Sequence, residues 1–190
     1  MLLLDTLREI GHTRIGFFEE TGQSLQFRYL QGGLLELGPL CGIAGLEWHP
    51  EWYFRHEISD LTHFEVCRAA ADYFATLEDR PEVLVMRSDL SAVTIAQEWR
   101  RRGIEVPRDI QLAACDDSLQ WPLAVDRQQD AVYSTITSFR PVPMYCASMP
   151  LREMAATALE LLQARLKNPR FVSRQVVFQP EVKLYEPQTK

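Results

Sequence analysis

Short apolar runs alternate with helix-like segments over the first 117 residues of the sequence. The runs at 14–18, 83–86 and 110–114 are rich in apolar side chains, as expected of strands that are covered on both faces. Between them, apolar residues recur at the spacing of a helix. Because strands that alternate with helices pair in parallel through right-handed crossovers, the sequence predicts an α/β protein with an open, doubly wound parallel sheet.

Apolar spacing and end signals place the expected helices. Thr62 and Glu65 have the spacing of a capping box, which predicts that a helix begins there, and Gly103 predicts the end of another. Residues 53–58, 132–139, 176–178 and 182–185 are further candidate strands. The expected helices lie at 3–10, 30–38, 62–77, 92–102 and 151–166.

Charge and length restrict the partners of the chain. The formal net charge is −6, so the chain as a whole repels a phosphate backbone, and we expect contact with DNA only through a part outside this sequence. The start of the sequence lacks the pattern of a secretory signal, and no stretch is long and apolar enough to span a membrane. These features favour a cytoplasmic protein without a membrane partner.

The cysteines and histidines show no metal-binding pattern. The cysteines are widely separated, lie in or beside apolar stretches and form no C-x-x-C pair, which is typical of buried free thiols. The histidines do not cluster with them. We therefore expect no metal and no cofactor.

Acidic residues follow two of the expected strands. In an open parallel sheet, ligands bind beyond the carboxyl ends of the strands, which selects the loops at 19–24, 59–62, 87–90 and 115–118. The third contains Asp89, and the last contains Asp116 and Asp117. A carboxylate there can accept hydrogen bonds from vicinal hydroxyls or from an amine. Alternatively, Asp89 caps the helix that it precedes, and one residue of the pair stiffens its own turn.

No enzyme signature accompanies these carboxylates. The sequence contains no G-x-S-x-G, no Walker loop and no G-x-G-x-x-G, and no nucleophile and base stand at a catalytic spacing. A phosphate-accepting receiver domain would place its acidic pair after the first strand, where "RIGFFEE" would have to supply it. We therefore expect that the chain is not an enzyme.

Three stretches in one order resemble signature regions of a known family. They are "LREIGHTRIGFF", "RPEVLVMRSDLSAVTIAQEWRRRGIEVPRDIQLAACDDS" and "PMYCASMPLREMAATALELLQARL". Together they resemble the effector-binding domain of lactose-repressor (LacI/GalR) family transcriptional regulators. The middle stretch is specific, through its G-x-x-V-P-x-D-I link before an apolar strand and D-D, and the likeness extends from about Leu3 to about Glu186.

The resemblance implies a class I periplasmic-binding-protein-like fold with two lobes, of which this chain is mainly the carboxyl-terminal one. Residues 1–140 would form that lobe, 141–170 an excursion helix into the other lobe, and 171–190 the return strands. The helix-turn-helix headpiece and most of the amino-terminal lobe would lie outside the chain. A small-molecule effector between the lobes, sugar-like or purine-like, would modulate operator binding by a homodimer.

The resemblance also implies effector-binding residues. Tyr29 stands where the family usually has an arginine, with Arg28 beside it, and Leu61 stands where an aromatic residue often stacks on the ligand. Asp116 matches the family pattern and would accept hydrogen bonds from the effector. Ser88 and Asp89 replace an Asn-Asp pair and would support the ligand or cap a helix.

Two other functions fit the same fold. The departures at Tyr29, Leu61 and Ser88 leave open an interaction module that dimerises without a ligand. A solute-binding protein of a transporter has the same architecture but requires export.

Overall fold

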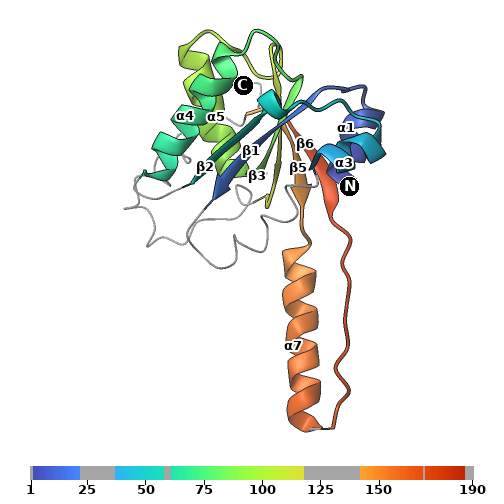
Figure 1. The fold of residues 1–190 in the computed structure, drawn as a ribbon. Helices are drawn as coiled ribbons and strands as arrows, with labels where there is room; N and C mark the ends of the chain where they lie inside the picture. The colour runs from blue at the N-terminus through green and yellow to red at the C-terminus, as the bar shows by residue number, and fades with distance from the viewer. Residues whose placement is uncertain (1, 22–36, 58–60, 118–141, 169, 187–190) are drawn as a thin grey trace.

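The computed structural model describes residues 2–21, 37–57, 61–117, 142–168 and 170–186. Within these ranges the chain forms a sheet of six strands in which all neighbours are parallel except the last pair. The expected α/β class with an open, mostly parallel sheet is confirmed (Figure 1). The strands, in spatial order, are β2 (Tyr53–Glu57), β1 (Ile15–Thr21), β3 (Val83–Ser88), β4 (Gln111–Cys115), β5 (Met144–Ser148) and β6 (Glu181–Tyr185).

Helices cover both faces of the sheet, and each face has its own apolar core. Alternate residues of β1 point to opposite cores: Phe18 packs with α4 (His63–Thr76) and α5 (Asp89–Arg101). Its neighbour Phe17 packs with α1 (Leu2–Glu9) and α3 (Leu37–Ala44). The sheet is thus doubly wound, which the sequence predicted.

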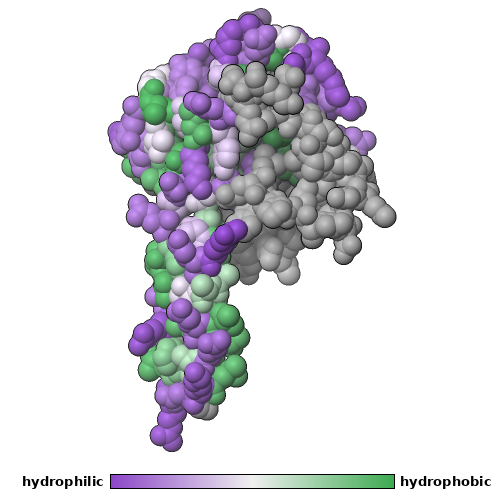
Figure 2. All heavy atoms as spheres, turned by 180° about the vertical axis from the view of Figure 1, so that it is seen from behind, coloured by the Kyte–Doolittle hydropathy of each residue, from purple (hydrophilic) through white to green (hydrophobic). Residues whose placement is uncertain are grey.

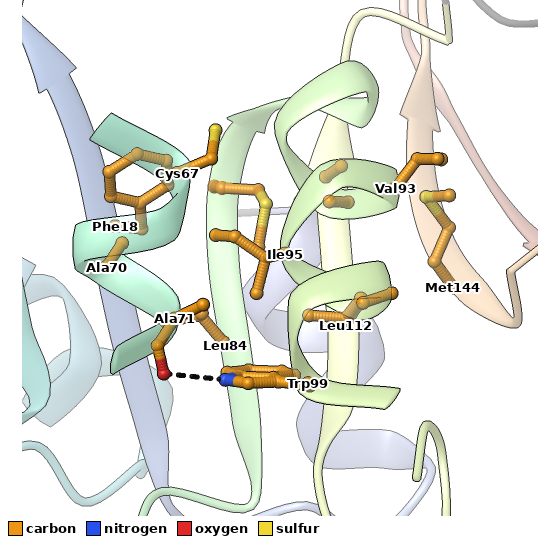
Figure 3. Packing of buried hydrophobic residues seen from close by; sticks show 14 of the residues in the cluster. Phe18, Cys67, Ala70, Ala71, Leu84, Val93, Ile95, Trp99, Leu112 and Met144 are labelled. Carbon is orange, nitrogen blue, oxygen red and sulfur yellow. Dashed lines mark hydrogen bonds between the residues drawn. The ribbon is translucent and has the colours of Figure 1, made fainter. Parts of the chain in front are cut away.

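The larger core is centred on Trp99 of α5. Its ring is 1% exposed, and its indole Nε1 donates a hydrogen bond of 3.0 Å to the carbonyl oxygen of Ala71 in α4 (Figure 3). Leu84 and Leu112 supply the floor from β3 and β4. Both helices therefore pack on the central strands of the sheet.

The start of α4 is set as its sequence predicts. The hydroxyl of Thr62 accepts a hydrogen bond from the Glu65 amide, and the Glu65 carboxylate accepts from the Thr62 amide. Strand β2, the expected strand at 53–58, is also confirmed, and a short 3-10 helix, η1 (Pro50–Trp52), leads into it. The helix expected at 30–38 does not end at Gly38, because α3 continues through it to Ala44. The start of that expected helix and the candidate strand at 132–139 lie outside the described residues.

The carboxyl-terminal part departs from one expected element. Strand β5 occupies 144–148 within the sheet, and the chain leaves the sheet after Ser148. The segment 176–178, expected as a strand, has no regular structure, and the sheet is rejoined only at Glu181. Residues 176–178 do not form a strand because they run beside the helix that projects away from the sheet, where no strand is available for pairing (Figure 1).

That projecting helix, α7 (Leu151–Lys167), has no buried residue. Leu159 and Leu162 are each 55% exposed and Leu166 is 74% exposed. Seen from behind, apolar side chains gather along the projecting part of the molecule that α7 forms (Figure 2). In the described ranges, no helix combines the length and the apolar character that crossing a membrane requires.

Candidate functional site

Buried polar side chains meet at the carboxyl ends of β3 and β4. Asp89 and Asp117 are each 1% exposed, and Cys146 of β5 lies beside them, with the ligand atoms of all three within 4.8 Å of one another. We call Asp89, Asp117 and Cys146 the buried acidic cluster. It occupies the edge of the sheet where ligands bind in open α/β folds, as the sequence predicted for the acidic loops.

The start of α5, directly after β3, positions Ser88 and Asp89. The hydroxyl of Ser88 accepts a hydrogen bond of 3.2 Å from the Leu90 amide and thereby caps α5. Asp89 is the first residue of the helix and points into the cluster, where the positive end of the helix dipole favours its charge. The sequence left open whether Ser88 or Asp89 caps the helix, and the structure shows that Ser88 does.

The turn after β4 positions Asp116 and Asp117. Asp116 and Asp117 both adopt left-handed backbone conformations, with φ of 77° and 51°, which aspartate tolerates better than most residues. The turn separates their side chains, so that Asp116 is exposed while Asp117 is buried. The acidic pair thus has one carboxylate facing outward at the ligand edge and one facing inward.

The environment of Asp116 raises the pKa of its carboxyl group. Partial loss of water around it is the largest cause, and the charge of Asp89 adds to it, whereas the exposed Arg87 acts in the opposite direction. A carboxylate that has lost part of its hydration gains more from a ligand hydroxyl or N–H than a fully hydrated one does. Asp116 is therefore suited to accept hydrogen bonds from a ligand.

The inward carboxylate is held by the last strand. The Tyr185 hydroxyl donates a hydrogen bond to Asp117 Oδ1, and Lys183 Nζ lies 3.6 Å from Asp117 Oδ2. The same ammonium group donates a hydrogen bond of 3.2 Å to Ser148 Oγ. Burial and the adjacent carboxylate of Asp117 both raise the pKa of Tyr185, so its hydroxyl remains a donor.

The remaining residue of the cluster is a thiol. Burial raises the pKa of Cys146 to about 12, and the negative charges of Asp117 and Asp89 contribute to the increase. At neutral pH the sulfur is therefore protonated. Although carboxylates and a thiol are metal-ligand types, this thiol would first have to lose its proton, and the ammonium of Lys183 already lies beside Asp117.

Leu61, another predicted site residue, is not brought to this cluster. Leu61, 37% exposed, precedes α4 at the carboxyl side of β2. Strand β2 lies three strand positions from β4, which is about 14 Å across the sheet. Arg28 and Tyr29 lie outside the described residues.

Sequence reasoning selected the loop with Asp116 and Asp117 but expected only Asp116 to bind the effector, and it did not select Lys183 or Tyr185. A signal was present in "EVKLY", where Lys183 and Tyr185 stand two residues apart and must share one face of the strand. What the sequence does not show is that β6 lies beside β5, close to the end of β4. The cluster is built from segments that are distant in the chain.

The comparison with known families agrees with the fold. The family model of the periplasmic binding protein-like domain matches residues 4–188. The chain belongs to this family.

More particularly, its relatives are regulators of the LacI type, so the resemblance to the LacI/GalR effector-binding domain is confirmed. This chain is 25% identical over 178 residues to the HTH-type transcriptional repressor PurR of Aliivibrio salmonicida, and the match covers 93% of this chain and 46% of the repressor. The ribose operon repressor of Haemophilus influenzae is 24% identical over 185 residues, covering 97% of this chain and 49% of that protein.

A solved LacI family transcription regulator from Clostridium acetobutylicum shares the fold, with a TM-score of 0.65 at 18% identity. The match covers 97% of this chain and 60% of that structure. The chain spans about half the length of the curated relatives that it matches.

Proposed function

We propose that this chain is the effector-sensing part of a LacI-type transcriptional regulator. The observation that carries the proposal is the turn after β4, which presents the partly desolvated carboxylate of Asp116 at the ligand edge of the sheet and buries Asp117 beneath it. Such a carboxylate selects ligands with several hydroxyl or N–H donors, which are features of sugars and purines. The regulatory relatives support the same function.

The projecting helix supports a two-lobed protein. A helix without a single buried side chain gains little stability from burial, so a partner surface is expected over α7. We assign that surface to an amino-terminal lobe, with residues 149–180 crossing into it and returning. The effector would then lie between the two lobes, with Asp116 contributed by the carboxyl-terminal one.

In this proposal the ligand acts by changing the relative stability of two lobe arrangements. An effector that contacts both lobes favours the arrangement in which both sets of contacts form. In a homodimer, the DNA-binding headpieces would respond to that arrangement with a change in operator affinity, and linkage requires that the operator change effector affinity by the same factor. The chain then needs no enzymatic chemistry and acts in the cytoplasm, where operator DNA is found.

Calorimetric titration of the complete gene product tests the proposal. The panel contains ribose and other monosaccharides, disaccharides and purine bases, and the tightest ligand is then measured against variants. Because a hydrogen bond to a charged group contributes about 1.5–3 kcal/mol, Asp116→Ala should weaken binding by about 10-fold to 100-fold. Asp72→Ala, in α4, whose carboxylate pairs with Arg102 at the carboxyl end of α5, is the matched control and should leave affinity unchanged. Equal affinity of the wild type and Asp116→Ala would refute the role of Asp116.

A further inference from the structure

Two side chains of the final strand join parts of the molecule that are far apart in sequence. Lys183 and Tyr185 stand two residues apart on β6 and reach the same side of the sheet, where β6 pairs with β5 in the antiparallel register Cys146↔Lys183. Tyr185 donates to Asp117, at the end of β4. Lys183 contacts both Asp117 and Ser148, at the end of β5.

The three segments that meet here have different continuations. The end of β4 continues into the turn that presents Asp116, and the end of β5 leads out to α7. Strand β6 is where the chain returns from α7. One ammonium group, that of Lys183, therefore touches the ligand-edge turn and the outgoing strand from its place on the returning strand.

The burial of Asp117 makes these contacts necessary for the shape of the turn. Its carboxylate is 1% exposed and lies close to the carboxylate of Asp89, which is equally buried. A buried charge that loses a donor is strongly destabilised, and the direct way to relieve it is to rotate the turn toward water. Because Asp116 is the preceding residue of the same left-handed turn, its carboxylate would move with it.

We propose that Lys183 and Tyr185 are positioning residues of the effector site, which fix the Asp116–Asp117 turn and tie it to the two strands that lead to and from α7. This inference rests on the proposed function and deepens it, since it gives a physical link between the ligand-contacting carboxylate and the excursion into the other lobe. A ligand bound to Asp116 and a movement of α7 would act on the same small set of hydrogen bonds.

Hydrogen exchange of the 190-residue chain, measured by mass spectrometry without ligand, tests the link. In Lys183→Met, exchange should accelerate at least about tenfold in peptides covering 113–117 and 145–150, since Lys183 contacts both Asp117 and Ser148. In Tyr185→Phe, which loses only the hydrogen bond to Asp117, the acceleration should be in 113–117. Peptides of β1 and β3 should be unchanged. The matched control is Tyr73→Phe, whose hydroxyl donates to the Glu51 carbonyl at 2.7 Å, and it should leave both affected regions as in the wild type.

A conservative variant separates positioning from general stability. Lys183→Arg keeps the positive charge and the donors, so it should restore slow exchange in both regions. Acceleration spread evenly over the whole sheet, or confined to β6, would overturn the inference, and so would equal acceleration in Lys183→Arg and Lys183→Met. Because this readout requires no ligand, it does not depend on whether an effector is found.

Affinity measurements then distinguish the two proposals. If Asp116→Ala abolishes effector binding in the complete gene product, Tyr185→Phe should weaken it as well, by less. If Asp116→Ala weakens binding and Tyr185→Phe changes neither affinity nor exchange, the positioning role is refuted while the proposed function stands. If exchange responds as expected and Asp116→Ala leaves affinity unchanged, the effector role of the turn is refuted.

Discussion

Replacing Trp99 with phenylalanine should destabilise the chain far more than the same replacement of Trp48. The indole of Trp99 is buried between α5 and α4 and donates to the Ala71 carbonyl (Figure 3). The indole nitrogen of Trp48 is also buried, but it has no hydrogen-bond partner within the part of the chain that the structure describes. The two variants therefore remove the same atoms, but only at Trp99 does the lost indole nitrogen make a hydrogen bond.

The expected difference follows from the lost contacts. In Trp99→Phe, the hydrogen bond contributes about 1 kcal/mol. The two ring carbons lost with it contribute about 1.6 kcal/mol at about 0.8 kcal/mol for each buried carbon group. The total loss in the free energy of unfolding is about 2.5 kcal/mol. In Trp48→Phe, removal of an unpaired donor offsets part of the lost packing, so we expect a loss below about 1 kcal/mol.

Urea unfolding monitored by far-ultraviolet circular dichroism measures both variants, because this signal does not depend on tryptophan fluorescence. The dependence of the unfolding free energy on urea should be the same for wild type and variants, so that the midpoints report stability alone. A loss in Trp99→Phe no larger than that in Trp48→Phe would show that the hydrogen bond to α4 contributes nothing, and the account of the larger core would be wrong.

Two further predictions concern the amino-terminal half of the sheet. Gly16→Ala would place a methyl group 2.6 Å from the Pro81 ring and should cost about 1–3 kcal/mol in thermal unfolding, whereas Gly42→Ala meets nothing within 4 Å and should be neutral or stabilising. Burial raises the pKa of Glu82, but hydrogen bonds from backbone donors outweigh it and the net pKa is lowered from 4.5. Its contribution to stability is therefore present above about pH 4.5 and is lost as the pH falls through the lowered value. Glu82→Gln should be less stable than wild type at pH 6, with the gap closing at pH 3; a constant gap would contradict this.

Local patterns were sufficient for most of the sheet and its covering helices. The apolar runs at 83–86 and 110–114 became β3 and β4, and the capping box at Thr62 marked the start of α4. These elements can be predicted because their signals, continuous apolar runs and a capping box, each lie within a few residues.

Helix α3 and strand β5 were not predicted, since their stability comes from elsewhere in the chain. The sequence of α3, LGPLCGIA, contains two glycines and a proline and has low helix propensity, but Cys41 and Ala44 are buried against α1 and β1. The residues of β5 become a strand because β4 and β6 lie on either side of them. Tertiary packing overrides local preference in both cases.

The position of the two aspartates at the carboxyl end of β4 could be predicted, but the surroundings of each carboxylate could not. Adjacent aspartates after a buried strand indicated the ligand edge, yet the sequence does not show which of the two faces inward. That choice depends on the backbone angles of the turn and on donors from β6, about 70 residues away in the chain. The groups that neutralise Asp117 come from β6 and meet it only in the folded sheet.

The paired left-handed conformations at Asp116 and Asp117 also limit how this part of the sequence can diverge. Asparagine and glycine adopt such angles readily, whereas β-branched residues do so at a high energetic cost. A drift to asparagine at Asp116 would preserve the turn and remove only the charge offered to the ligand. The preference for one ligand class over another could therefore change by a single substitution here, with the rest of the fold left intact.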